Sequence, residues 1–246
     1  MISTALVAVA SAVTSAAASA LTSATSVTSE PGLSLSVQGG GSAPVKLFLL
    51  LTALSFASAL LVSVTSFTRI IIVLSFLRQA LGTAQLPPNQ VLVGLSLVLS
   101  AFVMAPTGSR VYADALGPYL EDKIPPGDAL EKASVPVRAF MLRQTREEDL
   151  QLFYDISATP RPRHGELLPM SIVMPAFMVS ELTTAFRMGL YLFIPLVLVD
   201  LLVSALLMSM GMMMVPPTMI SLPLKIGIFV MADGWRLVVA SLARSF

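Results

Sequence analysis

The sequence contains no cysteine and only one histidine, His164. Without a thiol, the chain can form no disulfide bond, no thiolate metal site and no cysteine nucleophile. A single imidazole likewise excludes a multi-histidine metal site within one chain. Charged residues make up only 12% of the sequence, against roughly 25% in an average soluble domain. An ordinary water-soluble globular protein is therefore not expected.

The few charges are concentrated in one segment. Residues 107–166 carry 18 of the 29 charged side chains, whereas 55% of the whole chain is hydrophobic. A soluble fold would need an implausibly large dry core for such a composition, so we expect a membrane protein with one water-facing insert. The net charge of +1 argues against a nucleic-acid-binding protein, which needs a basic surface to bind phosphates.

The first 29 residues contain no charge and consist largely of alanine, serine, threonine and valine. The stretch Ala18-Ser19-Ala20 suits a signal-peptidase site, although the usual basic n-region is missing. We expect a signal peptide over residues 1–29, followed by a flexible linker over residues 30–44.

Four hydrophobic helical regions are expected after the leader. They lie at residues 47–67, at 91–105, at 167–214 with interruptions at Glu181 and Arg187, and at 219–243. The first hydrophobic region is long enough to cross roughly 30 Å of hydrocarbon. Pro106 is expected to end the second hydrophobic region. The chain is therefore an all-α membrane protein of helical hairpins, with hydrophobic regions at 45–106 and 167–246 on either side of the insert at 107–166.

The polar insert is expected to be helical, because Val137, Phe140, Met141 and Gln144 recur at near-helical spacing. It has two more acidic than basic residues, whereas the connection between the first two hydrophobic regions holds Arg69 and Arg78 and no acid. The positive-inside rule therefore predicts that the connection is cytoplasmic and that the insert lies outside the cytoplasm.

Six ionisable residues fall within the apolar regions of the second half. They are Glu181, Arg187, Asp200, Lys225, Asp233 and Arg236. Each would cost several kcal/mol in hydrocarbon unless it is paired or faces protein or water. Two interpretations stay open: the residues pair inside a helix bundle and serve assembly, for example Glu181 with Lys225, or they line a pathway.

Catalytic motifs are missing from the sequence. Asp200 and Asp233 are the only pair that could serve an intramembrane aspartyl protease, and neither lies in a Gly-x-Gly-Asp context. There is no Gly-x-Ser-x-Gly elbow, no His-Glu-x-x-His helix and no phosphate-binding glycine loop. We therefore expect neither an enzyme nor a bound cofactor.

Methionines cluster near the end of the third hydrophobic region, at positions 208, 210, 212, 213 and 214. Thioethers suit Cu(I), but no cysteine or nearby histidine would assist, and consecutive methionines would point in different directions on a helix. Adaptable core packing is a second interpretation. A third is a soft constriction that a ring of subunits would form around a pore. The sequence does not choose between the last two.

Several short stretches, which occur in order from about residue 44 to the end of the chain, resemble the FliP family of flagellar type III export-gate proteins, whose injectisome counterpart is SctR. These stretches are Thr65–Ile70, Leu77–Gly82, Pro87–Gln90, Met141–Glu147, Ser180–Leu182, Ala185–Phe186, Met210–Met214, Leu222–Lys225 and Asp233–Trp235. The leader and the long insert favour the flagellar branch.

The resemblance implies a non-enzymatic subunit in the bacterial inner membrane, within the flagellar basal body. It implies that five copies assemble with FliQ and FliR into a helical gate through which unfolded flagellar proteins pass, and that Met212, Met213 and Met214 lie on the pore axis. It also implies that nominal membrane spans pack against one another above the membrane plane. A small Met-rich metal or proton transporter remains the alternative.

Overall fold

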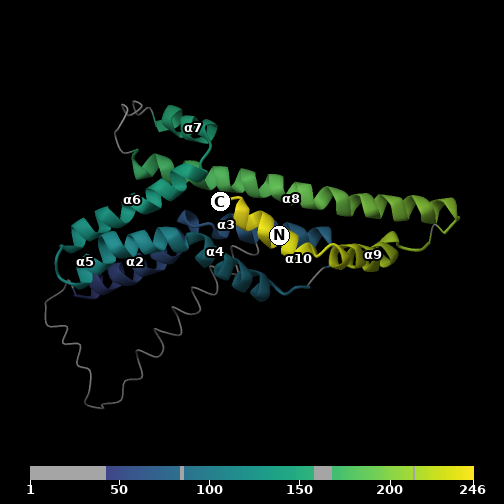
Figure 1. Cartoon of the computed structure of the whole chain (residues 1–246), viewed down its shortest axis with the longest axis horizontal. Helices are drawn as coiled ribbons and strands as arrows, with labels where there is room; N and C mark the ends of the chain where they lie inside the picture. The colour runs from purple at the N-terminus through teal and green to yellow at the C-terminus, as the bar shows by residue number, and fades with distance from the viewer. Residues whose placement is uncertain (1–42, 84–85, 158–167, 213) are drawn as a thin grey trace, which may run out of the picture. The chain divides into compact units, whose positions relative to one another are not determined.

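Every element in the described part of the chain is a helix (Figure 1), which confirms the all-α prediction. The computed structural model describes residues 43–83, 86–157, 168–212 and 214–246. The expected signal peptide, the linker up to residue 42, His164 and Met213 lie outside the described residues. The chain divides into two compact units, Met1–Leu60 and Leu61–Phe246.

Helix α2 (Ala43–Val64) begins in the first unit and ends in the second. It corresponds to the hydrophobic region expected at residues 47–67 and ends three residues earlier. Leu47, Phe48 and Leu49 near its start are all exposed. A helix with large apolar residues on several sides needs lipid or protein to cover it.

Helix α3 (Phe67–Ala80) occupies the segment that was expected to be a connection between the first two hydrophobic regions. Arg69, Val73, Leu77 and Ala80 recur every three or four residues on its buried face. This face packs against α4 (Asn89–Val111) and α8 (Met170–Ser209). Arg69 is therefore a core residue and not a charge in a water-facing loop, so only Arg78 still supports the cytoplasmic placement of this segment.

The prediction that Pro106 ends the second hydrophobic region was wrong. Helix α4 continues through Pro106 and leads without a break into the π-helical turn η1 (Tyr112–Leu116) and α5 (Gly117–Leu120). Proline removes one backbone hydrogen bond, but it bends a helix without ending it when the surrounding structure holds both halves. Here α6 packs along both α4 and η1.

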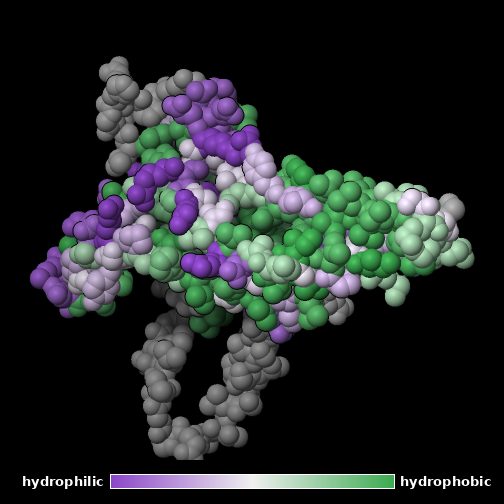
Figure 2. All heavy atoms as spheres, turned by 45° about the vertical axis from the view of Figure 1, so that its right-hand side comes forward, coloured by the Kyte–Doolittle hydropathy of each residue, from purple (hydrophilic) through white to green (hydrophobic). Residues whose placement is uncertain are grey.

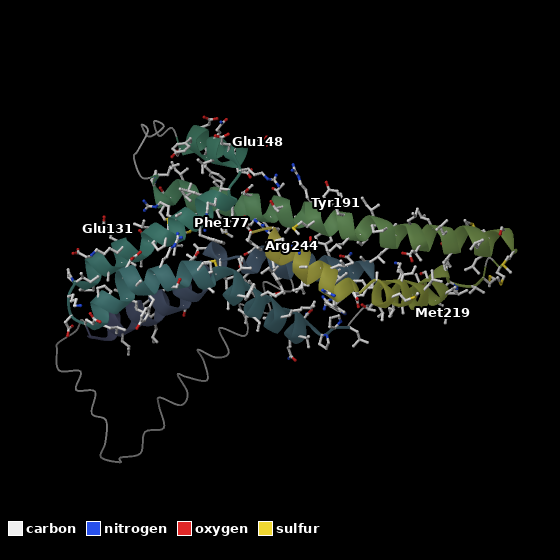
Figure 3. The ribbon with its side chains drawn as sticks, in the orientation of Figure 1. Glu131, Glu148, Phe177, Tyr191, Met219 and Arg244 are labelled. Atoms are coloured by element: carbon white, nitrogen blue, oxygen red, sulfur yellow. The ribbon has the colours of Figure 1, made fainter. Side chains whose placement is uncertain are left out.

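The polar insert contains α6 (Pro126–Gln144) and α7 (Glu147–Ser157), which confirms that it is helical. Glu131 and Glu148 project from the outer surfaces of these two helices (Figure 3). On the inner side, Phe140 packs edge-on against Phe177 of α8, with ring centroids 6.0 Å apart. The insert is therefore held to the hydrophobic helices by a core of its own.

Helix α8 runs for 40 residues without interruption. Glu181 and Arg187 interrupt its apolar sequence but not the helix itself, because Glu181 is buried against other helices and Arg187 is exposed. Helix α9 (Pro217–Met231) returns beside the C-terminal half of α8 (Figure 1). A bend of 64° then separates α9 from α10 (Gly234–Arg244).

Two stretches in the described residues are long and apolar enough to span a membrane. They are Asn89–Leu120 and Met170–Ser209, and the bent pair α9 and α10 counts as a third if it forms one span. Figure 2 shows hydrophobic residues gathered over the α8–α9 hairpin and hydrophilic residues over the insert. The division into apolar helices and a polar insert therefore matches the sequence pattern.

Gly189 of α8 is expected to tolerate no side chain. A Cβ atom there would lie 2.6 Å from Cγ and 3.0 Å from Cβ of Phe76 in α3. These atoms are close to the Phe76 backbone and cannot easily move, so Gly189→Ala should destabilise the chain by about 1 to 3 kcal/mol. Gly94→Ala in α4 is the control, because a Cβ there meets nothing within 4 Å. Thermal unfolding in detergent compares the variants, and equal midpoints would contradict the prediction.

Candidate functional site: buried ion pairs and a methionine turn

A buried ion pair joins Arg69 of α3 to Glu181 of α8, 112 positions apart in the sequence. The Arg69 Nε donates to Glu181 Oε2 at 2.8 Å, and the Arg69 Nη2 donates to Glu181 Oε1. Their side chains are only 2% and 0% exposed. This two-point geometry is the strongest form of arginine–carboxylate interaction, and it rigidly joins the two helices.

Two further segments reach the same guanidinium. Gln144, at the end of α6, accepts a hydrogen bond from the Arg69 Nη2 at 3.1 Å through its Oε1. The backbone carbonyl of Ser245, just after α10, accepts one from the Arg69 Nη1 at 2.7 Å. The Phe246 ring lies over the guanidinium, with its centroid 4.0 Å from Cζ. Arg69 therefore connects four parts of the chain that are distant in sequence.

The junction between α6 and α7 is also tied to α8. The backbone N–H of Arg146 donates to the Ser180 hydroxyl at 2.9 Å, and the Arg146 guanidinium donates to the Thr184 hydroxyl at 3.0 Å. Ser180 precedes Glu181 directly. The same turn of α8 therefore binds both the buried ion pair and the insert.

A second ion pair joins α8 to α9. The Lys225 Nζ donates to Asp200 Oδ2 at 2.5 Å and to the Ala80 backbone carbonyl at 3.0 Å. The Lys225 side chain is 5% exposed and the Asp200 side chain 35%. The suggested pairing of Glu181 with Lys225 was therefore wrong, because each residue has a different partner within the chain.

The other three charges of the apolar regions stand apart from these pairs. Arg187, Asp233 and Arg236 are exposed, and their side chains have no hydrogen-bond or ion-pair partner within the described ranges. Asp233 adopts a left-handed conformation with φ of 51°, at the bend between α9 and α10. The six candidates thus separate into two classes, because three are engaged inside the chain and three face outward.

A tight turn ends α8 and presents methionines at the tip of the α8–α9 hairpin. Gly211 has φ of 77°, and it and Met212 donate N–H groups to carbonyls of the last helical turn at 3.1 and 3.0 Å. This is a Schellman motif, in which glycine takes the left-handed position without strain. Met212 and Met214 follow in the turn, and Met214 is 96% exposed. They therefore lie beyond the helix end.

Comparison with known proteins decides the family. Residues 50–242 match the model described as the FliP family. The chain belongs to the FliP family. It is 54% identical to the flagellar biosynthetic protein FliP of Pectobacterium carotovorum subsp. carotovorum over 202 residues, which cover 82% of this chain and 78% of that protein.

Two further FliP-family relatives show how much of the chain the family covers. The flagellar biosynthetic protein FliP of Bacillus subtilis (strain 168) is 50% identical over 205 residues, 83% of this chain and 93% of that protein. The protein of the same name from Aquifex aeolicus (strain VF5) is 45% identical over 219 residues, 88% of this chain and 92% of that protein. These findings confirm the resemblance and give no support to a metal or proton transporter.

Sequence reasoning missed most of the surroundings of the buried ion pair. Arg69 was assigned to a connection, although it shares a helix face with Val73 and Leu77 and this spacing could have placed it in the core. No spacing pattern in the sequence indicated that Gln144 or Phe246 would contact Arg69. Their contacts with Arg69 depend on the packing of helices far apart in the sequence.

Proposed function

We propose that this FliP-family chain is a structural subunit of the flagellar type III protein export gate and helps to form its entry pore. In this role it binds no cofactor and catalyses no reaction. Five copies assemble with FliQ and FliR in the bacterial inner membrane, at the flagellar basal body, and unfolded flagellar proteins pass through the assembly. The family membership supports the flagellar role, since the relatives named above are flagellar biosynthetic proteins.

The methionine turn is the structural observation that carries the pore proposal. The α8–α9 hairpin is apolar along its length and ends in a turn whose described methionines, Met212 and Met214, are exposed. Methionine side chains are flexible and polarizable, so they can close around objects of different shape. In a pentamer, Met212, Met213 and Met214 would supply about 15 thioethers around one axis, which suits a compressible seal.

The dimensions of α8 support an assembly in which helices cover one another. At 1.5 Å per residue, the 40 residues of α8 extend about 60 Å, twice the hydrocarbon thickness of about 30 Å. Its exposed apolar residues include Leu190, Ile194, Leu198, Leu202 and Leu206. Contiguous apolar surface on this scale is typical of interfaces with protein or lipid. Neighbouring subunits would cover the part of α8 that lipid cannot.

The buried ion pairs favour assembly over a pathway-lining role. Glu181 and Lys225 have their polar atoms engaged within the chain, which removes them from any water-filled path. We assign Arg187, Asp233 and Arg236 to contacts with other subunits or with water, since they face outward. In this organisation, residues 1–29 direct the chain to the membrane and residues 30–42 are a linker, which is two residues shorter than expected because α2 begins at Ala43. Residues 107–166 lie in the periplasm.

Replacing Met212, Met213 and Met214 together by alanine tests the proposal. Shortening these three side chains should widen the constriction. We therefore expect cells carrying the variant to leak small ions while flagellar export is partly retained. Membrane-potential dyes and secretion of flagellar proteins measure the two effects. Met219→Ala combined with Met231→Ala is the control, because both methionines are exposed on α9 outside the turn. A triple variant that is as tight to ions as the parent but has lost bound copper would favour the transporter alternative.

A further inference from the structure

Ser245 and Phe246, which follow α10, complete the surroundings of Arg69. Arginine carries five N–H donors. Two of them are directed to Glu181 and one to Gln144, as described above. The remaining two, on Nη1, meet the backbone carbonyl and the hydroxyl of Ser245 at 2.7 and 3.1 Å. All five donors are therefore matched by acceptors only when Ser245 is in place.

Phe246 contacts both Arg69 of α3 and residues of α6. Its ring lies over the Arg69 guanidinium and stacks on Phe140 of α6, with centroids 6.5 Å apart and ring planes 19° apart. Its backbone oxygen accepts a hydrogen bond from Gln144 Nε2 at 2.7 Å. The Gln144 amide thus bridges Arg69 and Phe246, so the orientation of that amide depends on both. Phe246 contacts the polar insert through Phe140 and Gln144, and α3 through Arg69.

A cavity lies beside the Phe246 ring. Its volume is about 380 Å³, and its walls come from α4, α6 and the end of the chain. The lining includes Thr107 and Pro106 of α4 and Arg143 of α6, together with Phe246 itself. This space is open to the surface, so the Phe246 ring is not enclosed by other side chains on that side.

We propose that Arg69, Gln144 and Phe140 form a binding site for a peptide segment with the chemistry of Ser-Phe, and that Ser245 and Phe246 occupy it as a latch. The site recognises a backbone carbonyl through the guanidinium and an aromatic ring through Arg69 and Phe140. Occupation clamps α6, and with it the polar insert, to α3 and α8. Release leaves the Arg69–Glu181 pair intact, so the hydrophobic helices keep their arrangement while α6 loosens.

Hydrogen exchange of the full-length chain in detergent tests the latch. Deletion of residues 245–246 removes two acceptors of a buried cation, so exchange of amides in residues 137–144 should rise about tenfold or more. Amides of residues 196–209, in the C-terminal half of α8, should stay unchanged. Phe246→Leu, which keeps an apolar side chain but loses the cation–π contact, should give a smaller rise in the same segment. Arg244→Ala is the control, because Arg244 is exposed and lies next to the latch.

A synthetic peptide that spans residues 239–246 separates recognition from general packing. Added to the deleted chain, it should restore protection in residues 137–144, whereas the same peptide with Phe246→Ala should not. Unchanged exchange after deletion would overturn the latch, and so would an equal rise in every helix. Failure of the parent peptide to restore protection, or equal rescue by both peptides, would overturn the proposed recognition of a Ser-Phe segment.

Discussion

Replacing Glu181 by leucine should lower the stability of the chain by about 3 to 5 kcal/mol, because the buried Arg69 guanidinium loses its countercharge. Gln144 and Ser245 would still accept hydrogen bonds from Arg69 but cannot neutralise its charge. Thermal unfolding in detergent and the yield of assembled complex measure the effect. Arg187→Leu is the control, since Arg187 is exposed on the same helix, and its effect should stay within about 0.5 kcal/mol.

Double-mutant cycles should identify the partner of Glu181. Glu181→Leu combined with Arg69→Met should cost much less than the sum of the single changes, because both members of the pair are removed. Glu181→Leu combined with Lys225→Leu should be additive. Lys225 binds α8 at Asp200, 19 residues or about 28 Å along the helix from Glu181. Coupling between Glu181 and Lys225 would contradict the pairing seen in the structure.

The second ion pair should respond unequally to loss of its two members. Asp200→Leu leaves the Lys225 ammonium buried with only the Ala80 carbonyl as partner, and should cost about 3 to 5 kcal/mol. Lys225→Leu leaves Asp200, whose side chain is 35% exposed and can be solvated, and should cost only about 1 to 3 kcal/mol. Unfolding of both variants in detergent gives the comparison.

A reversed order of these two effects would show that the Asp200 carboxylate depends on Lys225 more than its exposure indicates. Equal and small effects would show that the pair contributes little to the fold. Arg236→Leu is a suitable control, because Arg236 is an exposed cation on the neighbouring α10 and its side chain has no partner within the described residues.

The sequence alone was sufficient to predict the all-α class and the division into apolar helices and a helical, polar insert, but it did not predict α3, whose segment was assigned to a connection. Long apolar runs and a charged insert with helical spacing depend on local composition and periodicity, which a single sequence displays directly. The helix boundaries were less predictable. Pro106 was expected to end the second hydrophobic region, whereas α4 continues through it and packs against α6.

Only the tertiary structure decided which charges meet. The sequence placed Glu181 and Lys225 in successive apolar regions, but α9 packs on the C-terminal half of α8 and brings Lys225 to the level of Asp200. Glu181 is instead reached by Arg69 from a helix 112 positions earlier. Hydropathy and spacing report the local preference of each segment for water or an apolar environment. The partner of a buried charge depends on the direction and offset of helices distant in sequence, and these become defined only when the helices pack together.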